Sequence, residues 1–161
     1  TRITLSVPLT VAVVDAFLVE GRAGLFAVPA GSVASVDLVE SSRLRSTLSG
    51  WFLAPERGSE QPEDFALIPV IHLDEALGLR AAGAGDPEAP PPHEGPVPML
   101  AYQLNGTRGA LAVGKILGRG DLMVRPLGPP LERLRKYSGV ALLDDGSPAL
   151  ILDLANLARS A

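Results

Sequence analysis

One order of short apolar segments and turns occurs twice along the chain, and this internal duplication restricts the possible folds most. Phe26-Ala27-Val28 corresponds to Leu111-Ala112-Val113, an offset of 85 positions. Val70-Ile71-His72-Leu73 corresponds to Ile151-Leu152-Asp153-Leu154, an offset of 81 positions. In both halves the later segment leads into a short stretch with helical periodicity. The duplication therefore predicts two related units within 161 residues.

Apolar and polar residues alternate through much of the chain, and this period of two is typical of β-strands. The segments predicted as strands are 3–7, 11–20, 25–29, 32–40, 51–53, 65–72, 97–104, 108–117, 121–127, 138–143 and 148–153. Short helical turns are predicted at 73–79, 129–136 and 154–160. Many short strands separated by turns favour small β-barrels, so the sequence indicates an all-β fold with two of them.

Glycine and proline divide these units. Residues 81–96 (AAGAGDPEAPPPHEGP) have no apolar period and are predicted to be a linker. The first barrel is then expected at approximately 10–80 and the second at approximately 97–153. Within the second, Asn105-Gly106 and Asp144-Asp145-Gly146 each predict a hairpin turn, because these residues tolerate positive φ.

Composition excludes several classes of protein. A hydrophobic fraction of 47% with 20% charged residues is typical of a globular chain, and the absence of cysteine leaves no disulfide or thiolate metal site. The net charge of −4 argues against a nucleic-acid partner. No apolar stretch approaches the roughly 20 residues that cross a bilayer, so direct membrane insertion is not expected.

The charge is unevenly distributed along the sequence. Residues 1–96 carry 13 acidic and 6 basic side chains, whereas residues 97–161 carry 5 acidic and 8 basic ones. If each half formed one barrel, an acidic barrel and a basic barrel would attract each other between neighbouring molecules.

Candidate catalytic patterns are weak. Gly109 to Ile116 resembles a phosphate-binding loop but lacks the serine or threonine after Lys115, so an ordinary strand is favoured. His93 lies in the linker, and His72 lies near Asp74 and Glu75 as a weak metal or catalytic candidate. Arg119-Gly120-Asp121 is interpreted as a turn. No catalytic residue, cofactor site or metal site is predicted.

Four segments follow one another along the chain: Leu25 to Val33, Ile68 to Gly78, Val113 to Leu127 and Ser138 to Asp153. Together, in this order, they resemble the CheW-like regulatory (coupling) domain of CheA-type chemotaxis histidine kinases. Pro8-Leu9-Thr10 resembles the junction at which the ATP-binding domain of such a kinase ends. The chain departs from the family pattern at Ser35, where a glutamate is common, and at Gly114, where an aspartate is common. It also has Asp64-Phe65 in place of an Arg-Gly pair.

The resemblance implies an all-β fold of two intertwined SH3-like five-stranded β-barrels with short helices. Residues 1–9 would be the end of the preceding kinase ATP-binding domain or a linker strand, and 10–161 the CheW-like domain, with a helix at 154–160. The chain would then be a fragment of a longer kinase.

By the same resemblance, this domain is non-catalytic. It would bind a CheW-like coupling protein and the cytoplasmic tip of chemoreceptors, and so control the kinase. It would associate head to tail with other CheW-like domains. It would be cytoplasmic and would reach the membrane only through receptor arrays.

Three other functions remain open: a free-standing CheW-type adaptor, a small hydrolase or metal-binding enzyme that uses His72, and a ligand-binding barrel. For the docking function, apolar side chains near the barrel ends are the candidate contacts. These protein-interaction candidates are Val36, Leu38 and Trp51 in the first barrel, and Leu117, Leu122 and Val124 in the second.

Overall fold

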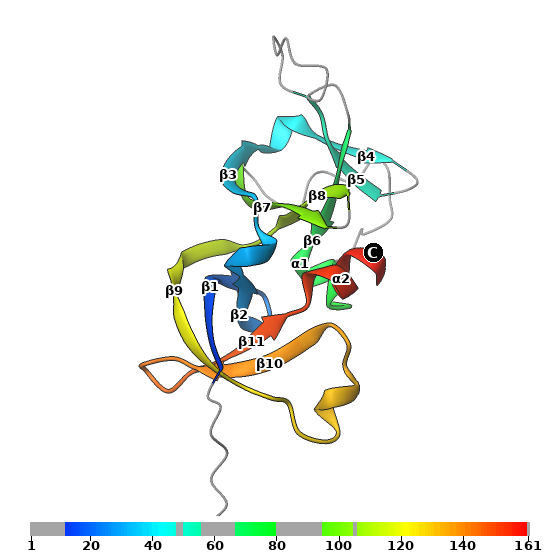
Figure 1. Cartoon of the computed structure of the whole chain (residues 1–161). Helices are drawn as coiled ribbons and strands as arrows, with labels where there is room; N and C mark the ends of the chain where they lie inside the picture. Colours follow the sequence, from blue (N-terminus) through cyan, green and yellow to red (C-terminus); the bar gives the residue numbers. More distant parts are fainter. Residues whose placement is uncertain (1–11, 48–49, 56–66, 80–94, 105, 161) are drawn as a thin grey trace, which may run out of the picture.

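The computed structural model describes residues 12–47, 50–55, 67–79, 95–104 and 106–160, and its strands form two sheets (Figure 1). One sheet is a closed barrel, in the order β1 (Ala12–Gly21), β2 (Gly24–Pro29), β11 (Pro148–Leu152), β10 (Tyr137–Leu142) and β9 (Lys115–Arg125). The other has six strands, in the order β3 (Ser35–Glu40), β7 (Pro96–Leu104), β8 (Thr107–Ala112), β6 (Ile68–His72), β5 (Gly50–Leu53) and β4 (Leu44–Thr47). The short helical elements are η1 (Ala30–Ser32), η2 (Ser41–Arg43), α1 (Leu73–Ala76), η4 (Leu131–Arg133) and α2 (Leu154–Ser160).

The two halves of the sequence exchange hairpins. The opening hairpin of the first half, β1–β2, joins β9, β10 and β11, and the opening hairpin of the second half, β7–β8, joins β3 to β6. Two parallel pairs make these junctions, with Ala27 opposite Ile151 and Ile71 opposite Leu111. The predicted ranges 10–80 and 97–153 therefore do not each form one barrel, because each sheet needs strands from both halves.

The chain crosses from one sheet to the other at Val113 and Gly114. The Val113 amide donates to the Pro98 carbonyl at 3.0 Å, and the Gly114 amide donates to the Glu20 carbonyl at 3.0 Å. A Cβ at position 114 would lie 2.8 Å from that Glu20 oxygen, so an aspartate here would require the backbone to shift. The predicted strand boundaries are therefore wrong here. In place of strands at 108–117 and 121–127, the structure has β8, which ends at Ala112, and a single continuous strand β9 that begins at Lys115.

Several local predictions are confirmed and others are not. Gly106 and Gly146 have φ of 80° and 82° in the two predicted hairpin turns, and the Ser147 amide donates to Asp145 Oδ1 at 2.8 Å. Arg119-Gly120-Asp121 lies within β9 opposite β1, so its interpretation as a turn was wrong. β4 was not predicted, because Leu44-Arg-Ser-Thr47 contains a single apolar residue. The predicted strand 3–7 lies outside the described residues.

Three apolar cores hold the sheets together. The barrel interior contains three buried alanines and one isoleucine, Ala16, Ala27, Ala141 and Ile151, and the partly buried Val14, Leu122 and Val124 pack against them. The six-stranded sheet has a core that includes Val39, Leu44, Val70, Val97 and Met99. The largest core lies between the two sheets and takes residues from both, together with α1 and α2, which lie beside this junction (Figure 1). The sheets therefore share most of their buried large side chains.

The start of α2 is capped by a side chain. Asp153 Oδ1 accepts a hydrogen bond from the Asn156 amide at 2.9 Å, and Asp153 Oδ2 accepts one from Asn156 Nδ2 at 2.6 Å. The helix then places Leu154 and Leu157 in the core between the sheets.

Replacing Asp153 with alanine is therefore expected to lower the free energy of unfolding by about 1 kcal/mol, because the first turn of α2 loses its cap. Denaturant unfolding measures this change. Asp144→Ala, at an exposed turn position, is the control and should stay within about 0.5 kcal/mol of wild type. Equal stabilities for the two variants would contradict a capping role for Asp153.

Candidate functional site: protein-interaction surfaces

His72 lies in a packed environment. The side chain is 7% exposed, and its ring meets Trp51 edge to face, with the ring centroids 5.6 Å apart and the planes at 81°. The neighbouring Asp74 instead accepts a hydrogen bond from the Arg22 amide at 2.9 Å, which ties α1 to the β1–β2 turn. Across the residues that the structure describes, no group of three or more histidine and carboxylate side chains could hold a metal ion. His93 lies outside those residues.

A cavity of about 220 Å³ lies along β3, β7 and β8 on the inner face of the six-stranded sheet. Its lining includes Val39 and Met99, with Ser35 and Asp37 nearby, joined by a hydrogen bond of 2.6 Å from Ser35 Oγ to Asp37 Oδ2. Small-molecule sites typically measure about 300–1,000 Å³. The volume gives little support to a ligand-binding barrel, and the closed barrel holds its own side chains instead.

The six predicted contact residues fall into two groups. Val36, Leu38 and Leu117 are 41%, 70% and 42% exposed. Trp51 packs against the core of the six-stranded sheet, and Leu122 and Val124 pack against the barrel interior. Only the first group presents apolar surface to a partner.

Val36 and Leu38 lie on one face of β3, an edge strand that pairs with β7 and with no other described strand. The residue opposite Val36 is Leu100, which belongs to the core between the two sheets. Val36 therefore borders the junction of barrel and sheet. An exposed edge strand next to such a junction is well suited to protein contacts.

Sequence patterns missed three exposed apolar side chains on the closed barrel, Val13, Met123 and Leu142, which are 60%, 64% and 56% exposed. Alternation could have suggested an outward face for each strand. In the structure Val13 is opposite Met123, and the pairing of Val124 with Ala141 brings Leu142 close to Met123 as well. The sequence of one strand does not show which residue of another strand lies opposite, so this grouping could be found only from the observed strand pairing.

An ion pair links β1 and β9 on the outside of this barrel. Arg119 Nε donates to Asp15 Oδ1 at 2.9 Å, and the guanidinium lies 5.3 Å from the centre of the Phe17 ring. Hydrogen bonding to Arg119 lowers the pKa of Asp15, and the carboxylate raises the pKa of Arg119. Both side chains are largely exposed, so the pair contributes little to the stability of the domain.

The structure changes the electrostatic prediction. Because each sheet contains strands from both halves of the sequence, an acidic half and a basic half do not become an acidic barrel and a basic barrel. Segments 56–66 and 80–94 together carry seven acidic and two basic residues, a net charge of −5. The excess of negative charge in the chain thus belongs to these two segments, which lie outside the described residues.

The sequence model of the CheW-like domain family matches residues 16–161. The chain belongs to the CheW-like domain family. Such a domain is a non-catalytic coupling module of chemotaxis signalling.

Relatives of this CheW-like domain include chemotaxis proteins CheA. The chain is 28% identical to that of Rhizobium meliloti over 94% of its length and 26% identical to that of Klebsiella aerogenes over 98%. It spans only 18% and 22% of these two proteins.

Among solved structures, the scaffolding protein TtCheW from Thermoanaerobacter tengcongensis superimposes with a TM-score of 0.60 at 18% identity. The match covers 89% of this chain and 91% of TtCheW, so the two share a fold. The predicted all-β, intertwined CheW-like fold is confirmed. In the described residues, one sheet closes into a barrel of five strands and the other stays a curled sheet of six.

Proposed function

We propose that this CheW-like domain is the regulatory domain of a CheA-type histidine kinase. It binds a CheW-like coupling protein and the cytoplasmic tips of chemoreceptors, and thereby controls the attached kinase. The observation that carries the proposal is the match of nearly the whole chain to about a fifth of each CheA relative. Phosphotransfer would belong to other domains of the parent protein.

A free-standing CheW-type adaptor is the second candidate, and the likeness to the scaffolding protein TtCheW supports it. The reading frame that encodes the chain distinguishes the two. A kinase ATP-binding domain immediately upstream supports the first proposal, and a start codon near Thr1 supports the second.

Both proposals place the domain in the cytoplasm, attached to the membrane only through receptor arrays. No helix in the described part of the chain is long and apolar enough to cross a bilayer.

The proposed contact residues are Val36, Leu38 and Leu117, because their apolar side chains are exposed at the edge strand β3 and on β9. Trp51, Leu122 and Val124 would support these surfaces from the cores they pack against. Head-to-tail association with other CheW-like domains could use the same surfaces.

Leu38→Ser and Leu117→Ser are expected to weaken binding to the cognate coupling protein at least about tenfold, because an exposed apolar anchor loses its contact with the partner. Isothermal titration calorimetry measures the Kd. The free energy of unfolding should change by less than about 0.5 kcal/mol, because neither residue belongs to a core.

Leu79→Ser provides the matched control, since Leu79 is 40% exposed but follows α1, away from both surfaces. It should bind like wild type. If alanine variants of all six candidates bind the coupling protein as tightly as wild type, this assignment of the surface is wrong.

A further inference from the structure

β3 lies at the margin of the six-stranded sheet and has one unpaired side (Figure 1). Its other side pairs with β7, and no further strand in the described part of the chain pairs with it. We name the unpaired side of β3 the free edge. Main-chain amides and carbonyls along such an edge are available to an additional strand.

The main chain of β7 shows in which direction each residue of β3 points. The Pro98 carbonyl accepts a hydrogen bond from the Val113 amide at 3.0 Å, so the main chain of Pro98 faces β8. The Ala101 carbonyl accepts one from the Ala34 amide at 2.7 Å, so the main chain of Ala101 faces β3. Main-chain direction alternates along a strand, and even-numbered residues of β7 therefore face away from β3.

Three residues of β3 consequently direct their main chain to the free edge. Leu38 lies opposite Pro98, which faces away from it, so the two form no hydrogen-bonded pair. In an antiparallel ladder the amide and carbonyl of such a residue point away from the partner strand. The same alternation applies to Val36 and Glu40, two residues before and after Leu38. Each of the three offers one amide and one carbonyl to a further strand.

The side chains of β3 alternate between two apolar surfaces. Val36 and Leu38 are 41% and 70% exposed on the outer face. Ser35, Asp37 and Val39 line the cavity of about 220 Å³ on the inner face, together with Leu53, Ile68 and Met99. A strand added at the free edge would place alternate side chains over this cavity and the others beside Val36 and Leu38.

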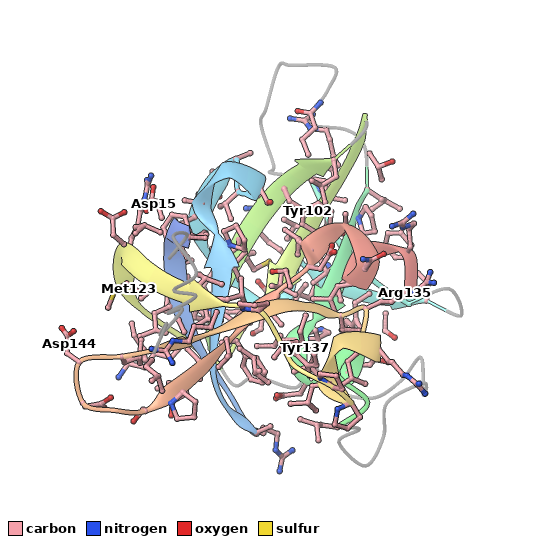
Figure 2. All side chains as sticks on the ribbon, turned by 60° about the horizontal axis from the view of Figure 1, so that its bottom comes forward. Asp15, Tyr102, Met123, Arg135, Tyr137 and Asp144 are labelled. Carbon is pink, nitrogen blue, oxygen red and sulfur yellow. The ribbon has the colours of Figure 1, made fainter. Side chains whose placement is uncertain are left out.

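This surface is separate from the outer strands of the closed barrel. Tyr102 also lines the cavity, and Figure 2 shows Tyr102 far from Asp144 of the β10–β11 turn. The cavity is smaller than typical small-molecule sites, but it has room for an aliphatic side chain.

The free edge is acidic. Asp37 and Glu40 are both exposed, whereas Arg43 and Arg45, which follow in the chain, donate to main-chain carbonyls. Arg108, the basic residue of the cavity lining, lies two strands away on β8. A second copy of β3 would bring two more carboxylates to this edge, and like charges on neighbouring strands are destabilising. Basic side chains on a partner strand would be favourable.

We propose that the free edge binds an extended segment of a partner protein, which pairs antiparallel with β3 and adds one strand to the sheet. Main-chain hydrogen bonds supply the affinity in such strand addition, and alternate side chains supply the specificity. The segment carries basic residues opposite Glu40 and Asp37, and apolar residues opposite Val39, Leu38 and Val36. The inference rests on the proposed function in one respect, since β3 belongs to the proposed contact surface.

Nuclear magnetic resonance of the labelled domain tests the proposal, with the blocked peptide Lys-Val-Val-Lys-Val-Thr as the probe. In the proposed register its first lysine lies opposite Glu40 and its third residue opposite Leu38. The peptide should bind with a Kd below about 1 mM. Solvent exchange of the Val36, Leu38 and Glu40 amides should slow at least about tenfold on binding, because each amide gains an acceptor.

N-methylation of the peptide tests the main-chain contact while the side chains stay the same. The amide of the third residue faces β3, so N-methylvaline there should weaken binding at least about tenfold. The amide of the second residue, opposite Val39, points away from β3. N-methylvaline at that position is the matched control and should leave the Kd within about twofold.

A charge exchange tests the register. Replacing the first lysine of the peptide with glutamate should weaken binding to wild type at least about threefold, because it lies opposite Glu40. Glu40→Lys should reverse this preference. The substitution should leave the fold intact, because the Glu40 side chain is exposed and makes no capping hydrogen bond to η2.

Equal Kd values for the two N-methylated peptides would overturn strand addition. Slow exchange of the Val36 and Leu38 amides before peptide is added would also overturn it, because another segment or a second copy would then cover the edge. A domain that binds the coupling protein but not the peptide refutes this inference alone. A domain that binds the peptide but not the coupling protein refutes the proposed function alone.

Discussion

Replacing Leu100 with alanine is expected to lower the free energy of unfolding by about 3–4 kcal/mol. Leu100, on β7, is 0% exposed and lies in the core shared by the barrel and the six-stranded sheet. Removing three carbon atoms there costs the transfer free energy of the side chain and leaves a cavity that packed strands cannot fill. Chemical denaturation monitored by circular dichroism measures the change.

Leu38→Ala is the matched control, because Leu38 lies on the neighbouring strand β3 but is 70% exposed. Its cost should be below about 0.5 kcal/mol. Both proteins should unfold in one transition, since the shared core couples the two sheets. A cost below about 1 kcal/mol for Leu100→Ala, or separate unfolding of barrel and sheet, would contradict a shared core.

Gly109→Val is expected to destabilise the domain by about 3 kcal/mol. Gly109 on β8 is directly opposite Tyr102 on β7, and a Cβ at position 109 would overlap the Tyr102 ring and hydroxyl. The ring cannot move aside easily, because Tyr102 is 4% exposed and packed in the core between the sheets. Burial also raises the pKa of its hydroxyl.

A double-mutant cycle tests this steric explanation. In the Tyr102→Ala background, Gly109→Val should cost at least about 2 kcal/mol less, because the overlapping ring is gone. Gly118→Val, on β9 with no atom within 4 Å of a built Cβ, makes the same change in open space and should be nearly neutral. Equal costs at positions 109 and 118 would show that lost backbone freedom, not the ring, decides the effect.

The sequence predicted elements better than their pairing. Alternation and turn residues located most strands, because both signals are local: Gly106 and Gly146 have the positive φ that their turns required. The exchange of hairpins was not visible in the residues themselves, because β2 and β11 pair across more than 100 positions. Strand pairing depends on which surfaces can be buried together, and that is a property of the whole chain.

The candidate contact residues show the same difference between what local patterns reveal and what depends on strand pairing. Leu38 and Leu117 were predicted as contacts and are exposed, whereas Leu122 and Val124 face the barrel interior. Their neighbour Met123 points outward. The sequence predicted one strand ending at 117 and another beginning at 121. It therefore did not show how inward and outward side chains alternate along the single strand β9, which begins just after the chain crosses between the sheets at Gly114.

The central claim is that this CheW-like domain acts through its outer surfaces on a chemotaxis coupling protein. Titration of the domain with the CheW-type coupling protein of the same organism tests this most directly. The account predicts saturable one-to-one binding that Leu38→Ser or Leu117→Ser weakens at least about tenfold, with the fold intact. A folded domain that gives no binding at coupling-protein concentrations up to about 1 mM would contradict it.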